Sequence, residues 1–173
     1  MILAVTGHRP PKLGGYGRLV NHRLAKFAFE VLTSMTERNT VERVLTGMTL
    51  GWDQAIAHAC IQQHVYFIAV VPFHGQEKAW PPASQETYKA ILDRADQVVV
   101  TANGDDYGAW KMHHRNRWLV DHADLLVALW DGSEGGTASC VQYAEKKGLP
   151  IVNVWDRWLE FIRTENEAQG ITL

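Results

Sequence analysis

The chain has 173 residues, of which 46% are hydrophobic and 21% charged, a composition that indicates one globular domain over residues 1–173 and excludes a disordered chain. Its net charge of −2 excludes the strongly basic surface of general nucleic-acid binders. No apolar run reaches the roughly 18 residues that span a membrane, and no signal peptide is evident, so we expect a cytoplasmic protein without membrane contact.

Short, nearly continuous apolar runs alternate with longer amphipathic stretches. The predicted strands are residues 2–5, 43–46, 66–71, 97–101, 125–130 and 151–155. The predicted helices are residues 18–38, 51–64, 84–94, 109–122, 135–147 and 157–166. Strands that are apolar throughout are covered on both faces, and an eightfold barrel needs about 250 residues. The pattern therefore predicts an α/β fold, a Rossmann-like open doubly wound sheet, mostly parallel, with helices on both faces.

Polar, glycine-rich segments follow the first, second and fifth predicted strands. Ligands of open α/β sheets bind beyond the carboxyl ends of the strands, where the strand order reverses, so these segments are candidate binding loops. The first begins Thr6-Gly7-His8-Arg9, and its cations and glycines suit either a flap over an anion or an ordinary surface loop. It contains neither G-x-G-x-x-G nor G-x-x-x-x-G-K-[ST], so a standard dinucleotide fingerprint and a P-loop are absent.

The second and fifth segments each lead from a strand into a helix. Gly47 belongs to the second, and Asp53 follows near the start of its helix, where a carboxylate favours the helix dipole, accepts a ribose hydroxyl, or does both. The glycines of the fifth segment either let a ligand phosphate approach the backbone or simply allow a tight turn. Its candidate binding residues are Gly132, Ser133, Gly135, Gly136 and Thr137.

The helix before the fifth strand carries a candidate cation. On a helical wheel, Arg115 borders an apolar stripe, whereas Arg117 points away from it and is expected to be solvated. The Arg115 guanidinium either reaches a ligand at the sheet edge or forms a salt bridge with a neighbouring carboxylate. We expect its removal to change stability little, because it borders the surface. The stripe consists of Met112, Asn116, Leu119, Val120 and Ala123.

Cysteine and histidine patterns give no sign of a metal site. Cys60 and Cys140 are the only cysteines, and we expect both to be reduced and buried in helices. The eight histidines show no zinc-ligand spacing, so neither a metal nor a resident cofactor is predicted.

Three separated motifs resemble the SLOG superfamily, which is named for Smf/DprA and LOG proteins, and within it the YpsA-like proteins. The resemblance covers about residues 1–155 and implies a Rossmann-like fold whose glycine-rich loops hold a nucleotide or nucleotide-derived ligand. The motifs are Thr6–Pro10, then Thr46–Met48 with Gly51–Asp53, then Arg115–Asp121 leading to Gly135–Thr137.

Two branches of this superfamily imply different activities. Met112-His113-His114-Arg115 is similar to the M-H-x-R run of LOG phosphoribohydrolases, which implies a catalytic role for Arg115. The following P-G-G-x-G-T-x-x-E motif differs here, since Cys140 stands where the catalytic glutamate is usual, and Glu134 on the other side of the turn is the candidate substitute. Residues 46–59 are similar to a DprA motif, and DprA proteins bind single-stranded DNA.

The leading hypothesis is a nucleotide-binding sensor or accessory protein that holds a nucleotide-type small molecule at the carboxyl edge of the sheet. The alternative is an enzyme that hydrolyses a nucleotide N-glycosidic bond. Single-stranded DNA binding is third, because few cations accompany the tryptophans. Self-association into a homo-oligomer stays open.

Overall fold

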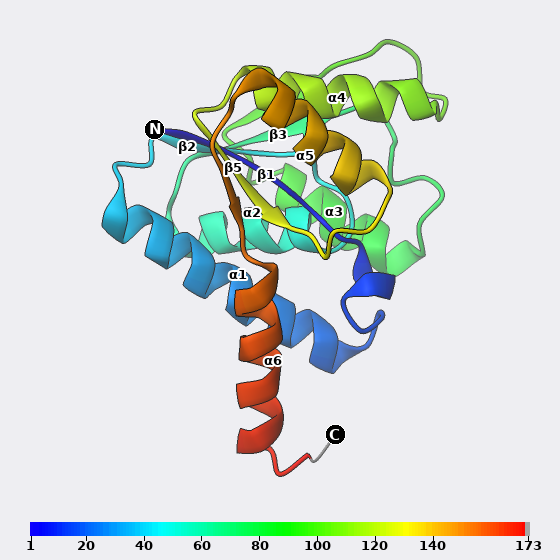
Figure 1. The fold of residues 1–173 in the computed structure, drawn as a ribbon. Helices are drawn as coiled ribbons and strands as arrows, with labels where there is room; N and C mark the ends of the chain where they lie inside the picture. Colours follow the sequence, from blue (N-terminus) through cyan, green and yellow to red (C-terminus); the bar gives the residue numbers. More distant parts are fainter. Residues whose placement is uncertain (172–173) are drawn as a thin grey trace.

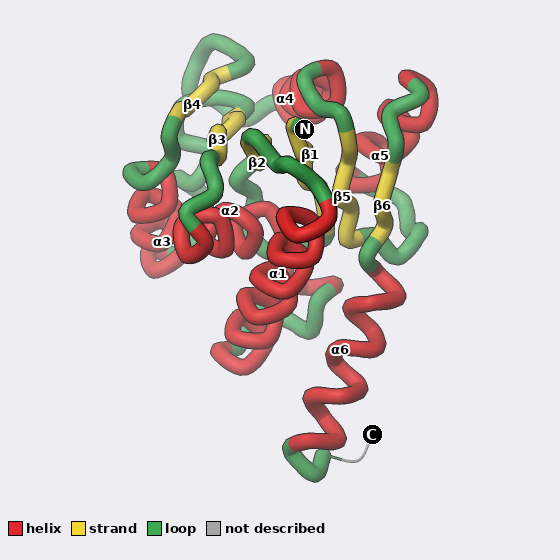
Figure 2. Tube along the Cα trace, turned by 90° about the vertical axis from the view of Figure 1, so that its left-hand side faces the viewer, coloured by secondary structure: helices red, strands yellow, loops and turns green. Residues whose placement is uncertain are grey.

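A single sheet runs through the computed structural model, which describes residues 1–171, and its strand order is β4-β3-β2-β1-β5-β6. All strand pairings within these residues are parallel, and Figure 2 shows the strands in this order from left to right. The Rossmann-like fold predicted from the sequence is confirmed. The strands are β1 (Ile2–Gly7), β2 (Arg43–Thr46), β3 (Phe67–Val71), β4 (Gln97–Val100), β5 (Leu125–Leu129) and β6 (Ile151–Asn153).

Helices cover both faces of the sheet, as predicted. In Figure 1 the first three helices and α6 lie below the sheet, and α4 and α5 lie above it. Each group has its own hydrophobic core against the sheet. The helices are α1 (Arg18–Arg38), α2 (Trp52–Gln63), α3 (Pro82–Leu92), α4 (Ala109–Asp121), α5 (Gly136–Lys147) and α6 (Trp155–Ala168), and a short 3₁₀ helix, η1 (Pro10–Lys12), follows β1.

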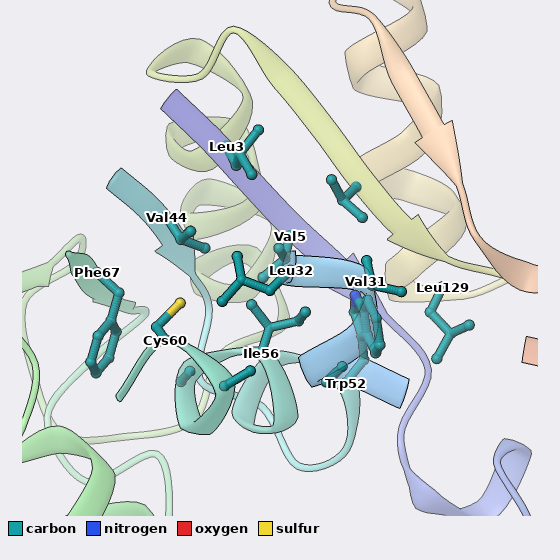
Figure 3. Packing of buried hydrophobic residues seen from close by; sticks show 14 of the residues in the cluster. Leu3, Val5, Val31, Leu32, Val44, Trp52, Ile56, Cys60, Phe67 and Leu129 are labelled. Carbon is teal, nitrogen blue, oxygen red and sulfur yellow. The ribbon is translucent and has the colours of Figure 1, made fainter. Parts of the chain in front are cut away.

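Trp52, the first residue of α2, packs in the core beneath β1. Its side chain is fully buried and lies near Val31 of α1 (Figure 3). A Cβ atom on Gly7 would lie 2.5 Å from Cδ1 of this indole. The last residue of β1 is therefore a glycine because the tryptophan occupies the space of a side chain.

The strand order reverses between β1 and β5. The chain proceeds from β1 through β2 and β3 to β4 on one side, and then returns to place β5 and β6 on the other. Because the strands are parallel, the segments after β1, β2 and β5 meet at one edge of the sheet. No helix within residues 1–171 is long and apolar enough to cross a membrane.

One predicted boundary is wrong in an informative way. The predicted strand 151–155 ends at Asn153, and Trp155 begins α6. Oδ1 of Asn153 accepts the backbone N–H of Trp155 at 3.2 Å and that of Trp130 at 3.3 Å. The asparagine side chain thus ends the strand and turns the chain into the helix, although the tryptophan has a high strand propensity.

Candidate functional site

A cavity of about 590 Å³ opens at the sheet edge where the strand order reverses. This volume is within the range of small-molecule sites. Its walls come from the segments after β1 and β5 and from α2, α4 and α5. The predicted site residues that line it are Thr6, Gly7, His8, Arg9, Asp53, Arg115, Glu134, Gly135, Gly136 and Thr137. The other three, Gly47, Gly132 and Ser133, support the lining from behind or beside it, as described below.

The buried side of the cavity consists of Arg115 of α4 together with Gly47, Thr49 and Asp53. We call this side the floor. Arg115 is only 3% exposed. Nη1 lies 3.8 Å from Oδ2 of Asp53 and donates a hydrogen bond to the carbonyl oxygen of Gly47. A Cβ atom on Gly47 would lie 1.6 Å from Nη1, so the guanidinium requires glycine there.

The expectation that Arg115 borders the surface is wrong, and the salt-bridge alternative describes the structure. A helical wheel assigns a charged residue to the edge of an apolar stripe, whereas here a carboxylate and a carbonyl oxygen from the β2–α2 segment face it. These partners compensate the removal of the charge from water. Arg117 is exposed, as expected, and lies over the ring of Tyr143.

Asp53 is also buried, and its two carboxylate oxygens differ. Oδ2 accepts hydrogen bonds from the hydroxyl of Thr49 at 2.6 Å and from its backbone N–H at 3.3 Å. Oδ1 of Asp53 and Nε of Arg115 have no hydrogen-bond partner within residues 1–171. Burial raises the pKa of the Asp53 carboxyl, against the opposing charge of Arg115, and lowers the pKa of the Arg115 guanidinium. The floor therefore has one free acceptor and one free donor on side chains that line the cavity.

The amino end of α5, residues Gly135–Thr137, forms an open side of the cavity, which we call the wall. Gly135 is the N-cap residue at φ 138°, and within residues 1–171 no side chain caps the helix or places a negative charge in its first turn. A Cβ atom on Gly135 or Gly136 would meet no described atom within 4 Å. The first N–H groups of α5, and the positive end of its dipole, are thus available to a ligand.

A cluster of polar side chains, the rim, ties the first binding loop to the fifth. Nε2 of His8 lies 2.7 Å from Oδ1 of Asp131, and the Lys12 ammonium lies 3.8 Å from Oδ2 and donates to the Ser133 hydroxyl. Burial lowers the pKa of His8, and hydrogen bonds from Ser133 hold the pKa of Asp131 well below its usual range. Ser133 and Gly132, which has φ 87°, therefore shape the turn that carries the wall.

The structure offers only a partial counterpart to the catalytic glutamate of LOG enzymes. Glu134 is exposed and lines the cavity. Cys140 is fully buried, as predicted, and burial raises the pKa of its thiol to about 11. A neutral thiol therefore occupies the sequence position of the glutamate.

The cavity also contains residues that the sequence did not single out as binding residues. Tyr107, from the loop before α4, and His113 of α4 both line it, and Tyr107 is 72% exposed. The only signal for Tyr107 was its place in a glycine-containing loop after the fourth strand. Because that loop also has the composition of a plain connector, the sequence could not separate the two roles.

The fold and the cavity define a Rossmann-like α/β protein with a ligand-sized site at the reversal of its strand order. The YpsA family, described as the YspA SLOG family, matches residues 3–153. The chain belongs to this family, as its motifs indicated.

A relative agrees with this family assignment, and two solved structures are similar in fold. The chain is 32% identical over 148 residues to the SPbeta prophage-derived protein YoqJ of Bacillus subtilis, covering 75% of this chain and 86% of YoqJ. DNA processing protein A (DprA) from Streptococcus pneumoniae superposes with a TM-score of 0.61 at 18% identity, over 86% of this chain and 48% of DprA. The molybdenum cofactor carrier protein of Chlamydomonas reinhardtii superposes with a TM-score of 0.54 at 18% identity. This match covers 96% of this chain and 85% of the carrier protein. The chain spans about half of DprA, and at these identities the two structures share its fold.

Proposed function

We propose that the cavity binds a phosphorylated, nucleotide-type small molecule, with its phosphate at the wall and its sugar over the floor. The observation that carries this proposal is the amino end of α5, which no side chain within residues 1–171 caps and which opens into the same cavity as the exposed Arg9. Backbone N–H groups at a helix start and a nearby guanidinium are the groups that bind phosphate in many folds.

Exposed cations at the cavity add to the attraction for an anion. Arg9 lines the cavity and is exposed, and within residues 1–171 no carboxylate lies within ion-pair distance of it. Its charge is therefore free to neutralise phosphate. Asp53 also lines the cavity, so a sugar placed over the floor would have a carboxylate acceptor beside it.

A binding role, as a sensor or accessory protein, fits the side chains better than hydrolysis. The oxocarbenium-like transition state of N-glycoside cleavage needs a nearby carboxylate. The buried Cys140 thiol does not supply that charge. Of the two carboxylates that line the cavity, Asp53 faces Arg115, which leaves only Glu134 for this role.

The test is a matched pair of glycine variants, Gly136→Val and Gly17→Val. Neither position has positive φ or any atom within 4 Å of an added Cβ, and both lie at helix starts, but only Gly136 lines the cavity. We expect the wild-type chain to bind ribose 5-phosphate in calorimetry, Gly136→Val to weaken that binding at least tenfold, and Gly17→Val to leave it unchanged. No wild-type binding, or equal binding by both variants, would overturn the proposal.

N-glycosidic hydrolysis is the second candidate, because Glu134 shares the cavity with Arg115. It predicts release of free base from nucleoside monophosphates, measured by chromatography, and loss of that release in Glu134→Gln. Base release at the rate of a protein-free control would exclude it.

DNA binding ranks third. The structural likeness to DprA extends to the fold, and one solved structure in that group is described by its single-stranded DNA binding mode. A fluorescent single-stranded oligonucleotide tests it, since the lining cations Arg9 and Lys12 would then make binding strongly salt-dependent.

A further inference from the structure

The carboxyl half of α6 extends away from the sheet (Figure 1 and Figure 2), and the helix lies beyond residues 3–153, which the family matches. α1 holds one side of it. The ring centres of Phe27 and Trp158 lie 5.3 Å apart, and Arg23 donates a hydrogen bond to Oδ1 of Asn166 at 2.8 Å. The protruding helix is therefore fixed to the body of the protein along this side.

Another side of α6 carries an apolar stripe, which consists of Trp155, Leu159 and Ile162. These residues follow one another at spacings of four and three, so they share one face of the helix. Leu159, in the middle, is 52% exposed, and the other two are partly exposed. An amphipathic helix normally turns such a stripe toward a core, whereas this stripe faces solvent.

Two more exposed apolar residues lie at the carboxyl end of α6. The backbone N–H of Ile171 donates to the carbonyl oxygen of Asn166 at 3.0 Å. Leu19 lies one turn of α1 before Arg23, which binds the side chain of the same asparagine. Both Ile171 and Leu19 are exposed. Exposed apolar residues that occur singly need no explanation, but a group of them along one helix marks an interaction surface.

The charges beside the stripe suit a second α6 that runs in the opposite direction. Asp156 lies three residues before Leu159 and Arg163 lies four residues after it, so both are on the same flank, about 60° and 40° from it around the helix. A two-fold axis beside Leu159 brings the two stripes together. It also places Arg163 of each copy opposite the partner's Asp156, because the two residues lie at nearly equal distances from the axis.

Both charges are available for this contact. Within residues 1–171 no cation lies within ion-pair distance of Asp156. The Arg163 guanidinium lies 2.5 Å from Glu160 and 2.7 Å from Glu167 of its own helix, but all three side chains are exposed. Such surface pairs contribute little to stability, and a guanidinium has five donors, so Arg163 can also bind a carboxylate of a second chain.

We infer that the chain forms a two-fold symmetric dimer in which the α6 helices pack antiparallel, with Leu159 at the axis and Arg163 of each copy paired with the partner's Asp156. The helix is about 21 Å long, so antiparallel packing places the two sheets at opposite ends of the helix pair. The interface is separate from the cavity and does not depend on the proposed function.

Sedimentation equilibrium of the full chain is the first test. We expect the wild type to change from monomer to dimer as its concentration rises to roughly 100 µM, since two four-turn helices bury less area than a standard interface. Leu159→Lys should weaken the dimer at least tenfold. Val98→Lys places the same charge at another exposed apolar residue, on the edge strand β4, and should dimerise like the wild type. Because both residues are exposed, both variants should keep the wild-type melting temperature.

Two charge variants test the antiparallel arrangement. In Arg163→Glu, and separately in Asp156→Lys, the inferred dimer has two pairs of like charges, so each variant alone should be monomeric. An equimolar mixture has two pairs of opposite charges in the mixed dimer and should dimerise. Recovery in the mixture also shows that both variants are folded.

Three results would overturn the inference. A wild-type chain that stays monomeric would mean that another molecule, or solvent alone, contacts the stripe. A dimer that Leu159→Lys leaves unchanged would mean that the chains associate through another surface. A mixture of the two charge variants that is no more dimeric than either variant alone would exclude the antiparallel pairing.

Discussion

The floor and the wall of the cavity lie side by side but are built in opposite ways. On the floor, Arg115 and Asp53 are 3% and 4% exposed and hold each other and the chain around them. On the wall, Gly135 and Gly136 are exposed and have no side chain, and the helix that they begin is uncapped. The comparison indicates that the fold depends on the floor for stability, while the wall contributes little to folding and remains available to a ligand.

The largest effect is expected from Arg115→Ala. This variant leaves the Asp53 carboxylate buried without its opposite charge, which should lower the free energy of unfolding by about 3 kcal/mol. Arg117→Ala, on the exposed side of the same helix, should lower it by no more than about 0.5 kcal/mol. Urea denaturation of both variants measures the difference.

A double variant distinguishes the contribution of the ion pair to stability from the effect of losing side-chain volume. Arg115→Met with Asp53→Asn removes both charges and keeps most of the packing, so it should be more stable than Arg115→Ala. If the double variant is instead at least as destabilised as Arg115→Ala, the pairing across the floor is not what stabilises this region.

The apolar periodicity of the sequence was sufficient to predict the fold, but it was not sufficient to predict the buried ion pair of the floor. Residues 18–38 and 43–46 were predicted with the bounds that α1 and β2 have, because their periodicity depends on local spacing alone. The end of β6 and the burial of Arg115 depend on single side-chain contacts with distant segments, namely Asn153 with Trp130 and Arg115 with Asp53. Such contacts leave no periodic signal in the sequence.

The position of the cavity could be predicted from the sequence where its lining comes from the carboxyl ends of strands. The rule that ligands bind where the strand order reverses brought the segments after β1 and β5 together correctly, and with them Arg9 and Gly136. Tyr107 lines the cavity as well, but its loop after β4 also has the composition of a plain connector, so the sequence could not assign it to the site.

A smaller effect is expected from a matched pair of glycine-to-alanine variants. In Gly47→Ala the new methyl group overlaps Nη1 of Arg115, so the guanidinium must move and the free energy of unfolding should fall by about 1–3 kcal/mol. In Gly136→Ala the methyl group enters open space at a helical residue, so stability should stay the same or rise by up to about 1 kcal/mol. Thermal unfolding of the two variants measures this contrast, and equal destabilisation would show that the wall is as constrained as the floor.

The smallest effect is expected at the rim, from His8. Burial lowers the pKa of this histidine below its ordinary value of 6.5, against the opposing hydrogen bond with Asp131. The folded chain therefore binds this proton less readily than the unfolded chain, and His8 should cause stability to be lost as the pH falls from about 6.5 through the folded-state pKa.

His8→Gln removes the titration, so urea denaturation between pH 7 and pH 5 should show a smaller decline for the variant than for the wild type. The lowered pKa of Asp131 acts in a separate range, since stability from a carboxylate is lost only as the pH falls below about 4. An identical decline in both chains between pH 7 and pH 5 would mean that protonation of His8 does not strain the rim.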